Sequence, residues 1–180
     1  PMAIRLALTH KWKGNIWYNM YYGEGKHNIK GYYQETWENA AFGGRTFYLG
    51  YECPEDGVLQ LKKSKYLEKI SKMENRISQI NHFQNSVPDS RIAILFSIHA
   101  GGNWKFNKFT KEPYGILGKT IKLSQRLQEM GYLTDMIPTS EIANGNFTMK
   151  NDKARYGNQE YDGIVVCYPE YIKKQSLTFL

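Results

Sequence analysis

Two carboxylates in aromatic-rich surroundings are the side chains of this sequence best suited to chemistry. Glu24 stands in the segment 21–25, which reads Tyr-Tyr-Gly-Glu-Gly, and Glu52 follows the aromatic stretch 45–51. A carboxyl group that faces a substrate can act as a general acid or base, or as a nucleophile. On a solvated turn it does none of these, and the sequence leaves that alternative open for both residues.

The other reactive side chains match no catalytic or metal-binding pattern. The four histidines lack the spacing and partners of a metal site, so neither a metal nor another cofactor is expected. Cys53 and Cys167 are far apart, and Cys167 lies in an apolar run, so both are expected to be free thiols. The glycines after His99 lack the order of a phosphate-binding loop.

The composition is that of a folded, basic protein. The 180 residues carry 24 Lys and Arg against 17 Asp and Glu, a net charge of +7, with a mean hydropathy of −0.60. No apolar run approaches the roughly 20 residues that cross a bilayer, and no signal peptide is evident, so we expect no membrane association and a cytoplasmic location, with periplasm and secretion left open. Because acids interrupt the basic residues, nucleic acid is not an expected partner.

Buried strands alternate with helices in the second half of the chain. Residues 91–98 form a β-branched, apolar run that predicts a buried strand, and 116–130 has helical spacing that ends at Gly131. Residues 132–137 and 161–168 are further strand candidates, which predicts a parallel sheet with right-handed crossovers. Three strands with one full helix would leave a sheet face bare, so we expect further chain or a partner to cover it.

The first half shows a similar succession of strands and helices. It contains no internal repeat, flexible linker or low-complexity tract, and the natural boundary with the second half lies at 85–90. The expected strands are 4–8, 16–22 and 45–51, and the expected helices are 28–42 and about 64–83.

A helix that ends in Ala-Phe-Gly-Gly, the aromatic strand 45–51, an amphipathic helix and the strand from Arg91 follow one another in this order. The succession resembles the junction between the (β/α)8 barrel and the trimerisation domain of family forty-two type β-galactosidases. The resemblance implies an α/β fold in which residues 1–87 hold the last strand–helix units of the barrel. Residues 88–180 would then form a partial flavodoxin-like sheet, of the trimerisation or glutamine-amidotransferase-like type, that is incomplete within this chain.

The resemblance also implies where a site would lie. Retaining glycosidases use two carboxyl groups about 5–5.5 Å apart, and barrel enzymes carry such groups at the carboxyl ends of their strands. The family's acid/base residue follows the fourth barrel strand, which lies outside this chain. The nucleophile follows the seventh strand, which implies Glu24, while Glu52 past the eighth strand would bind a sugar hydroxyl.

Aromatic side chains gather in the same part of the chain. Twelve of the 26 Phe, Trp and Tyr residues fall between Trp12 and Tyr51. The C–H faces of a sugar ring stack on flat apolar rings, which suits a carbohydrate site, and packing within the fold is the alternative. The side chains expected to bind substrate at the opening are Trp17, Tyr21, Tyr22 and Tyr51.

Two functions from different classes fit these observations. In the first, the chain is part of a glycosidase that cleaves β-galactosides or related glycans, with a carbohydrate as substrate and with the second domain forming homo-oligomer contacts. In the second, it is a non-catalytic α/β module that binds or assembles through a basic surface. Since the acid/base residue lies elsewhere, the segment by itself is expected to be inactive.

Overall fold

The chain divides into two compact units, and one is inserted into the other along the sequence. The computed structural model describes residues 2–14, 16–19, 36–47, 67–83, 87–100 and 115–179. Residues 1–14 and 88–180 form one unit, called here the sheet unit, and residues 15–87 form the inserted unit. From the sequence, residues 1–14 were expected to belong with 15–87, whereas in the structure they pack with the second half of the chain.

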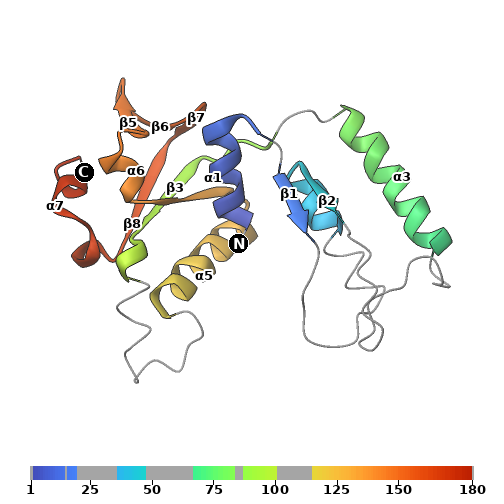
Figure 1. The fold of residues 1–180 in the computed structure, drawn as a ribbon, viewed down its shortest axis with the longest axis horizontal. Helices are drawn as coiled ribbons and strands as arrows, with labels where there is room; N and C mark the ends of the chain where they lie inside the picture. The colour runs from blue at the N-terminus through green and yellow to red at the C-terminus, as the bar shows by residue number, and fades with distance from the viewer. Residues whose placement is uncertain are drawn as a thin grey trace. The chain divides into compact units, whose positions relative to one another are not determined.

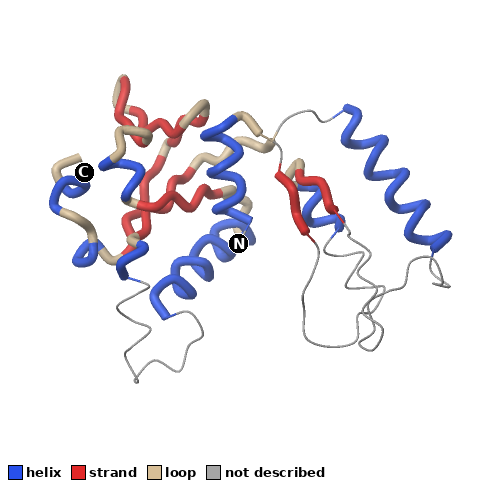
Figure 2. Tube along the Cα trace, in the orientation of Figure 1, coloured by secondary structure: helices blue, strands red, loops and turns tan. Residues whose placement is uncertain are grey.

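The sheet unit combines a parallel sheet, an antiparallel sheet and helices (Figures 1 and 2). Its elements are α1 (Met2–Trp12), β3 (Ile92–Phe96), α5 (Gly115–Glu129), β4 (Thr134–Pro138), α6 (Ser140–Ala143), β5 (Phe147–Lys150), β6 (Lys153–Tyr156), β7 (Gln159–Tyr161), β8 (Gly163–Cys167), the 3-10 helix η2 (Pro169–Tyr171) and α7 (Lys174–Leu177).

The central strand of the parallel sheet is β3, with β4 on one side and β8 on the other. Both neighbours are parallel to it, so that Ile94 lies opposite Met136 on β4 and Val165 on β8. Ala93, Ile94 and Leu95 have no exposed surface, which shows that both faces of this strand are buried. The three strands and the parallel sheet expected from the sequence are therefore confirmed.

Helix α5 covers one face of this sheet. Its residues Leu117, Ile121 and Leu127 pack near Ile94 and Met136 in one apolar cluster. The helix ends as expected at a glycine, because Gly131 has a φ of +90° and the amide of Tyr132 donates to the carbonyl of Leu127 at 2.8 Å. This hydrogen bond closes the last turn and directs the chain into β4.

The antiparallel sheet β5–β6–β7 covers the opposite face, which was expected from the sequence to need further chain or a partner. Its inward side chains, Phe147, Tyr156 and Tyr161, pack with Leu95 and Ile137 of the parallel sheet. The sequence suggested only a short connection between β4 and β8. The correction has a physical reason, since strands of three or four residues show too little alternation to be recognised singly.

The segment expected as a strand at 4–8 is helical, and that prediction is wrong. The alternation of Ile4, Leu6 and Leu8 suggested a strand, but the buried residues of α1 follow a helical period, and Leu8 is exposed. The buried set is Ala3, Leu6, Ala7, Thr9 and His10. Because Ala3 and Ala7 are small, α1 can pack closely against the edge strand β4.

The inserted unit contains a parallel strand pair and a long helix, within the residues described. β1 (Ile16–Asn19) pairs with β2 (Gly44–Phe47), residues 36–41 between them are helical, and α3 (Leu67–Phe83) follows. These elements lie within the strands and helices expected there, except that β2 begins one residue earlier, at Gly44. The described residues of this unit show one parallel pair and no closed barrel, so the structure supports a mixed α/β fold.

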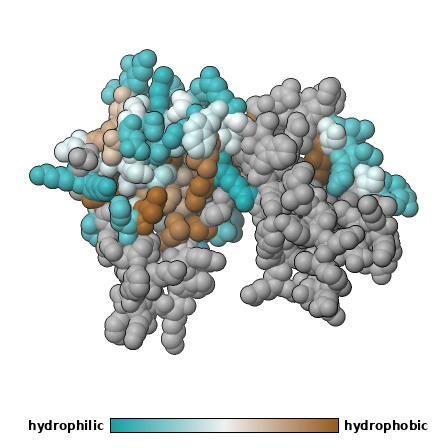
Figure 3. All heavy atoms as spheres, viewed as in Figure 1, coloured by the Kyte–Doolittle hydropathy of each residue, from teal (hydrophilic) through white to brown (hydrophobic). Residues whose placement is uncertain are grey.

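The surface of the sheet unit differs between its layers. Figure 3 shows apolar surface on the visible face where α1 and α5 lie, and hydrophilic surface over the antiparallel sheet. None of the helices in the described ranges is long and apolar enough to cross a membrane. Cys167 is a free thiol, as expected, and Cys53 lies outside the described residues.

Truncation of one buried side chain on the central strand tests this description of the core. We expect Leu95→Ala to lower the free energy of unfolding by about 2 to 5 kcal/mol, because Leu95 is fully buried and the substitution leaves a cavity. Met149→Ala removes a side chain that is 47% exposed and should cost far less. Denaturant unfolding of both variants measures the difference, and equal losses would contradict the assignment of β3 as the centre of the core.

Candidate functional site

The carboxyl ends of β1 and β2 lie at one edge of the strand pair. The parallel register joins Ile16 to Gly44 at the start of the strands and Asn19 to Phe47 at their ends. Chain that leaves both strands therefore starts from neighbouring backbone positions. In α/β folds, this edge is where loops carry ligand-binding and catalytic side chains.

A close contact between the intervening helical segment and β2 sets the start of that strand. Gly43 adopts a φ of +71°, and its amide donates to the carbonyl of Ala40 at 2.9 Å, so the helical segment ends there. A Cβ atom on the next residue, Gly44, would overlap the side chain and carbonyl of Asn39. The two glycines thus serve different needs, a left-handed turn at Gly43 and close packing at Gly44.

One of the six residues expected at the site falls within the described strands. Trp17 lies in β1, where its backbone is paired with Arg45 of β2. The remaining residues lie outside the described part of the chain, and their roles stay predictions: Tyr21, Tyr22, Glu24, Tyr51 and Glu52. In sequence, Glu24 is the fifth residue after the end of β1, and Glu52 is the fifth after the end of β2.

The sheet unit contains a buried polar cluster that the sequence analysis missed. Asp135 on β4 has no exposed surface, and its Oδ2 accepts a hydrogen bond of 2.6 Å from the hydroxyl of Tyr161. The Nδ1 atom of His10 on α1 lies 2.6 Å from the same oxygen. A buried carboxylate needs such donors, because its desolvation is costly when it is left without partners.

A second acid is held in a similar way, by a basic side chain of α1 and a tyrosine of the antiparallel sheet. The Oε2 atom of Glu141 accepts hydrogen bonds from Lys11 at 2.6 Å and from Tyr156 at 2.8 Å. Asn146 donates to the same oxygen at 3.1 Å. Consecutive residues of α1 thus each reach an acid of the sheet unit, and each acid also binds a tyrosine of the antiparallel sheet.

The surroundings of these groups change their pKa values. Burial acts to raise the pKa of Glu141, but the hydrogen bonds from Lys11, Tyr156 and Asn146 and the charge of Lys11 together outweigh it and leave this pKa below its usual value. Burial, followed by the hydrogen bond to Glu141, raises the pKa of the Tyr156 hydroxyl. Burial and the charge of Asp135 raise the pKa of Tyr161 in the same direction. Both tyrosines therefore stay protonated and act as donors.

The cluster is a structural element and gives no site for a substrate. Asp135 and Tyr161 are at most 2% exposed, and His10 is 9% exposed. The hydrogen bonds of the cluster hold α1 against β4 and connect both to the antiparallel sheet. The sequence held one signal of it, since an acid at position 135 inside the apolar segment 132–137 must find partners when that segment becomes a buried strand.

No metal centre is found among the side chains that the structure describes. No group of three or more His, Cys, Asp and Glu residues there could hold a metal ion. At the carboxyl end of β8, burial raises the pKa of the Cys167 thiol, and a hydrogen bond with Thr120 opposes this only in part. A thiol with a raised pKa is a poor nucleophile, so this end of the sheet offers no activated cysteine.

The lowered pKa of Glu141 predicts a pH-dependent contribution to stability. A carboxylate whose pKa is lower in the folded state stabilises the fold above its unfolded pKa, and this contribution disappears as the pH falls through the folded pKa. We expect Glu141→Gln to lower the free energy of unfolding at pH 7 by about 1.5 to 3 kcal/mol, because charge-assisted hydrogen bonds are lost.

The difference between Glu141→Gln and the wild type should shrink as the pH falls below the usual range of glutamate. Denaturant unfolding between pH 7 and pH 3, with the exposed Glu129→Gln as control, measures it. A difference that stays constant over this range would contradict the role of the Glu141 charge.

Comparison of the chain with protein-family models, with curated proteins and with solved structures finds no match.

Proposed function

We propose that the chain is part of a retaining glycosidase that acts on β-galactosides or related glycans. In this proposal β1, the helical residues 36–41 and β2 are the last strand–helix–strand unit of a (β/α)8 barrel. The sheet unit is then a partial flavodoxin-like domain that forms homo-oligomer contacts. Glu24 is the nucleophile, Glu52 binds a sugar hydroxyl, and a carboxylic acid from another part of the barrel completes the pair.

The observation that carries this proposal is the register of β1 and β2. In a barrel, successive strands are neighbours, run parallel and are joined by a helix, and this pair has all three properties. An open doubly wound sheet also contains such units, so the residues that come after each strand in sequence must distinguish the two folds. Acidic and aromatic residues come after both carboxyl ends, where barrel enzymes carry their catalytic groups, and this favours the barrel.

The aromatic residues fit the same substrate class. Trp17 belongs to β1, and Tyr21 and Tyr22 follow it in sequence, while Tyr51 follows β2. Flat apolar rings next to carboxylates suit a pyranose, which offers C–H faces for stacking and hydroxyls for hydrogen bonds. In this proposal these four residues line the opening through which the glycan enters.

The charge distribution favours the second candidate function, a binding or assembly module. The sheet unit carries 15 Lys and Arg against 9 Asp and Glu, a net charge of +6 out of +7 for the chain. On α5, Lys119, Lys122 and Arg126 are exposed at spacings of three and four residues, which places them on one side of the helix. Such a stripe can attract an acidic polymer through long-range electrostatics.

Trapping of the covalent intermediate tests the first candidate. We expect the full-length protein to be labelled by a 2-deoxy-2-fluoro-β-galactoside with a good leaving group, and mass spectrometry should place the label on the peptide that contains Glu24. Glu24→Gln should abolish the label and lower kcat on a chromogenic β-galactoside by orders of magnitude, because the amide cannot form the glycosyl ester.

A substrate-binding variant and a control variant separate binding and chemistry from stability. Glu52→Gln should raise KM more than it lowers kcat, and Glu68→Gln, which changes an exposed acid paired with Lys72 on α3, should leave both constants unchanged. Turnover close to that of the wild type in a folded Glu24→Gln variant would overturn the assignment of the nucleophile.

A salt titration tests the second candidate. We expect a fluorescent heparin fragment to bind the full chain with an affinity that falls steeply as the salt concentration rises, because bound counterions are released. The double variant Lys119→Gln/Arg126→Gln should weaken binding and flatten this dependence, whereas Lys150→Gln on the antiparallel sheet serves as the matched control. Affinity that does not respond to salt would dismiss the basic surface as a binding site.

A further inference from the structure

The inserted unit is joined to the sheet unit by two connections, and one hairpin contacts the chain close to each of them. The chain leaves the sheet unit after α1, at Gly14, and returns to it at Pro88, just before β3. Between β6 and β7 the hairpin turns at Gly157 and Asn158. Its residues bind the last turn of α1 on one side and the segment before β3 on the other.

The first grip is on the end of α1. The amide of Asn158 donates to the carbonyl of His10 at 3.2 Å. Gly157 has a φ of +60°, and a Cβ atom there would overlap the His10 carbonyl oxygen and the Lys11 Cα atom. The turn and the helix end are therefore in direct backbone contact. Tyr156, the residue before the turn, donates a hydrogen bond to Glu141, and Glu141 also accepts one from Lys11 on α1.

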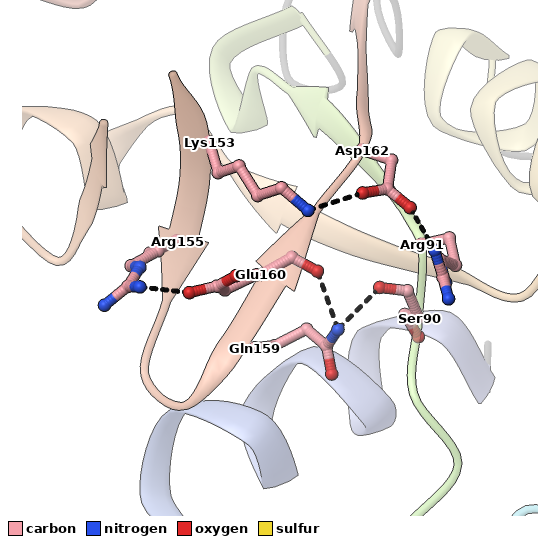
Figure 4. A network of polar contacts seen from close by, with 7 residues as sticks. All are labelled: Ser90, Arg91, Lys153, Arg155, Gln159, Glu160 and Asp162. Atoms are coloured by element: carbon pink, nitrogen blue, oxygen red, sulfur yellow. Dashed lines mark hydrogen bonds and ion pairs between the residues drawn. The ribbon is translucent and has the colours of Figure 1, made fainter. Parts of the chain in front are cut away.

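The second grip is on residues 90 and 91, just after the chain returns. The buried side chain of Gln159 donates to the carbonyl of Ser90 at 2.8 Å, and Figure 4 shows this bond beside its second bond, to the carbonyl of Glu160. The amide of Asp162 donates to the carbonyl of Arg91 at 2.9 Å. The carboxylate of Asp162 pairs with Arg91 at 2.6 Å and with Lys153 at 3.1 Å.

The contacts of the second grip differ in strength. Arg91 and Asp162 are exposed, and such surface pairs contribute little to stability. The hydrogen bond from the Gln159 side chain to Ser90 is buried. The hydrogen bond from the backbone amide of Asp162 to the carbonyl of Arg91 continues the backbone pairing next to β3. The second grip therefore depends mainly on these two hydrogen bonds, and less on the ion pairs of Asp162.

The hairpin itself is anchored to the core. Tyr156 and Tyr161, one on each of its strands, are at most 2% exposed and pack in the apolar cluster that covers the parallel sheet. Arg155 and Glu160 pair across the two strands on the outer side (Figure 4). A hairpin fastened on its inner face and paired across its strands moves as one element.

We propose that the β6–β7 hairpin is a clamp that holds both connections to the inserted unit, so that loosening one connection loosens the other. The clamp does not depend on the proposed glycosidase activity, because all of its contacts lie within the sheet unit. The clamp would fix the two points between which the inserted unit is held, whatever that unit binds.

Two amide protons report the two grips directly, those of Asn158 and Asp162. We expect Gly157→Ala to speed hydrogen exchange of both amides by at least about tenfold, measured by NMR on the full chain, while the amides of β3 and β4 stay protected. The new methyl group must push the turn away from His10. Gly131→Ala is the matched control, since its φ is also positive but no atom lies near its Cβ.

The reciprocal variant tests the coupling from the other side. Gln159→Ala removes the bond to Ser90 without touching α1, and it should speed exchange of the Asn158 amide as well as that of Asp162. If Gly157→Ala does not fold, this variant decides alone. Faster exchange confined to the mutated side, or the same effect in Gly131→Ala as in Gly157→Ala, would overturn the clamp.

Discussion

Burial of β3 on both faces is the constraint on which the sheet unit depends. A strand buried on both faces must be covered from two sides, and its backbone must be paired on both edges. The chain meets the first need with two different layers, α5 on one face and the antiparallel sheet on the other. It meets the second with β4 and β8. The crossover from β4 to β8 runs through the antiparallel sheet, so the cover of the core is also the route of the chain.

Placing acidic side chains in this core and at its edge creates a second requirement. Asp135 and Glu141 are each held by one tyrosine from the antiparallel sheet and one basic side chain from α1. Since a buried carboxylate without donors would be strongly destabilising, α1 and the antiparallel sheet depend on each other through these acids. The contacts also explain why the first 14 residues belong to the sheet unit although 73 residues separate them from the rest of it.

The inserted unit carries the residues of the proposed glycosidase site, and the sheet unit carries the two connections that hold it. Both features follow from the same arrangement, in which a strand–helix–strand unit interrupts an α/β fold between its first helix and its central strand. Catalytic groups placed on chain that follows strands depend on the scaffold beneath them for position. Within the sheet unit, the β6–β7 hairpin contacts the last turn of α1 and residues 90 and 91, close to where the chain leaves this unit and returns to it.

The strands with strong local signals could be predicted from the sequence alone. Apolar runs favour burial, and three such runs made β3, β4 and β8 predictable: residues 91–98, 132–137 and 161–168. The end of α5 was predictable because glycine readily adopts the left-handed conformation that Gly131 has there. The acidic and aromatic residues around Glu24 and Glu52 were likewise visible as candidates, although their roles stay predictions. These are properties of neighbouring residues, and periodicity records them.

Only the tertiary structure decided the rest. Residues 4–8 alternate like a strand, but packing against β4 favours the helical set of buried residues in α1. The short strands β5, β6 and β7 gain stability from cross-strand pairs and from their tyrosines on the parallel sheet, which no local pattern records. The contact between Gly157 and His10 joins residues 147 positions apart. Such contacts depend on which surfaces meet in space, and that is why spacing along the chain could not reveal the clamp or the buried acids.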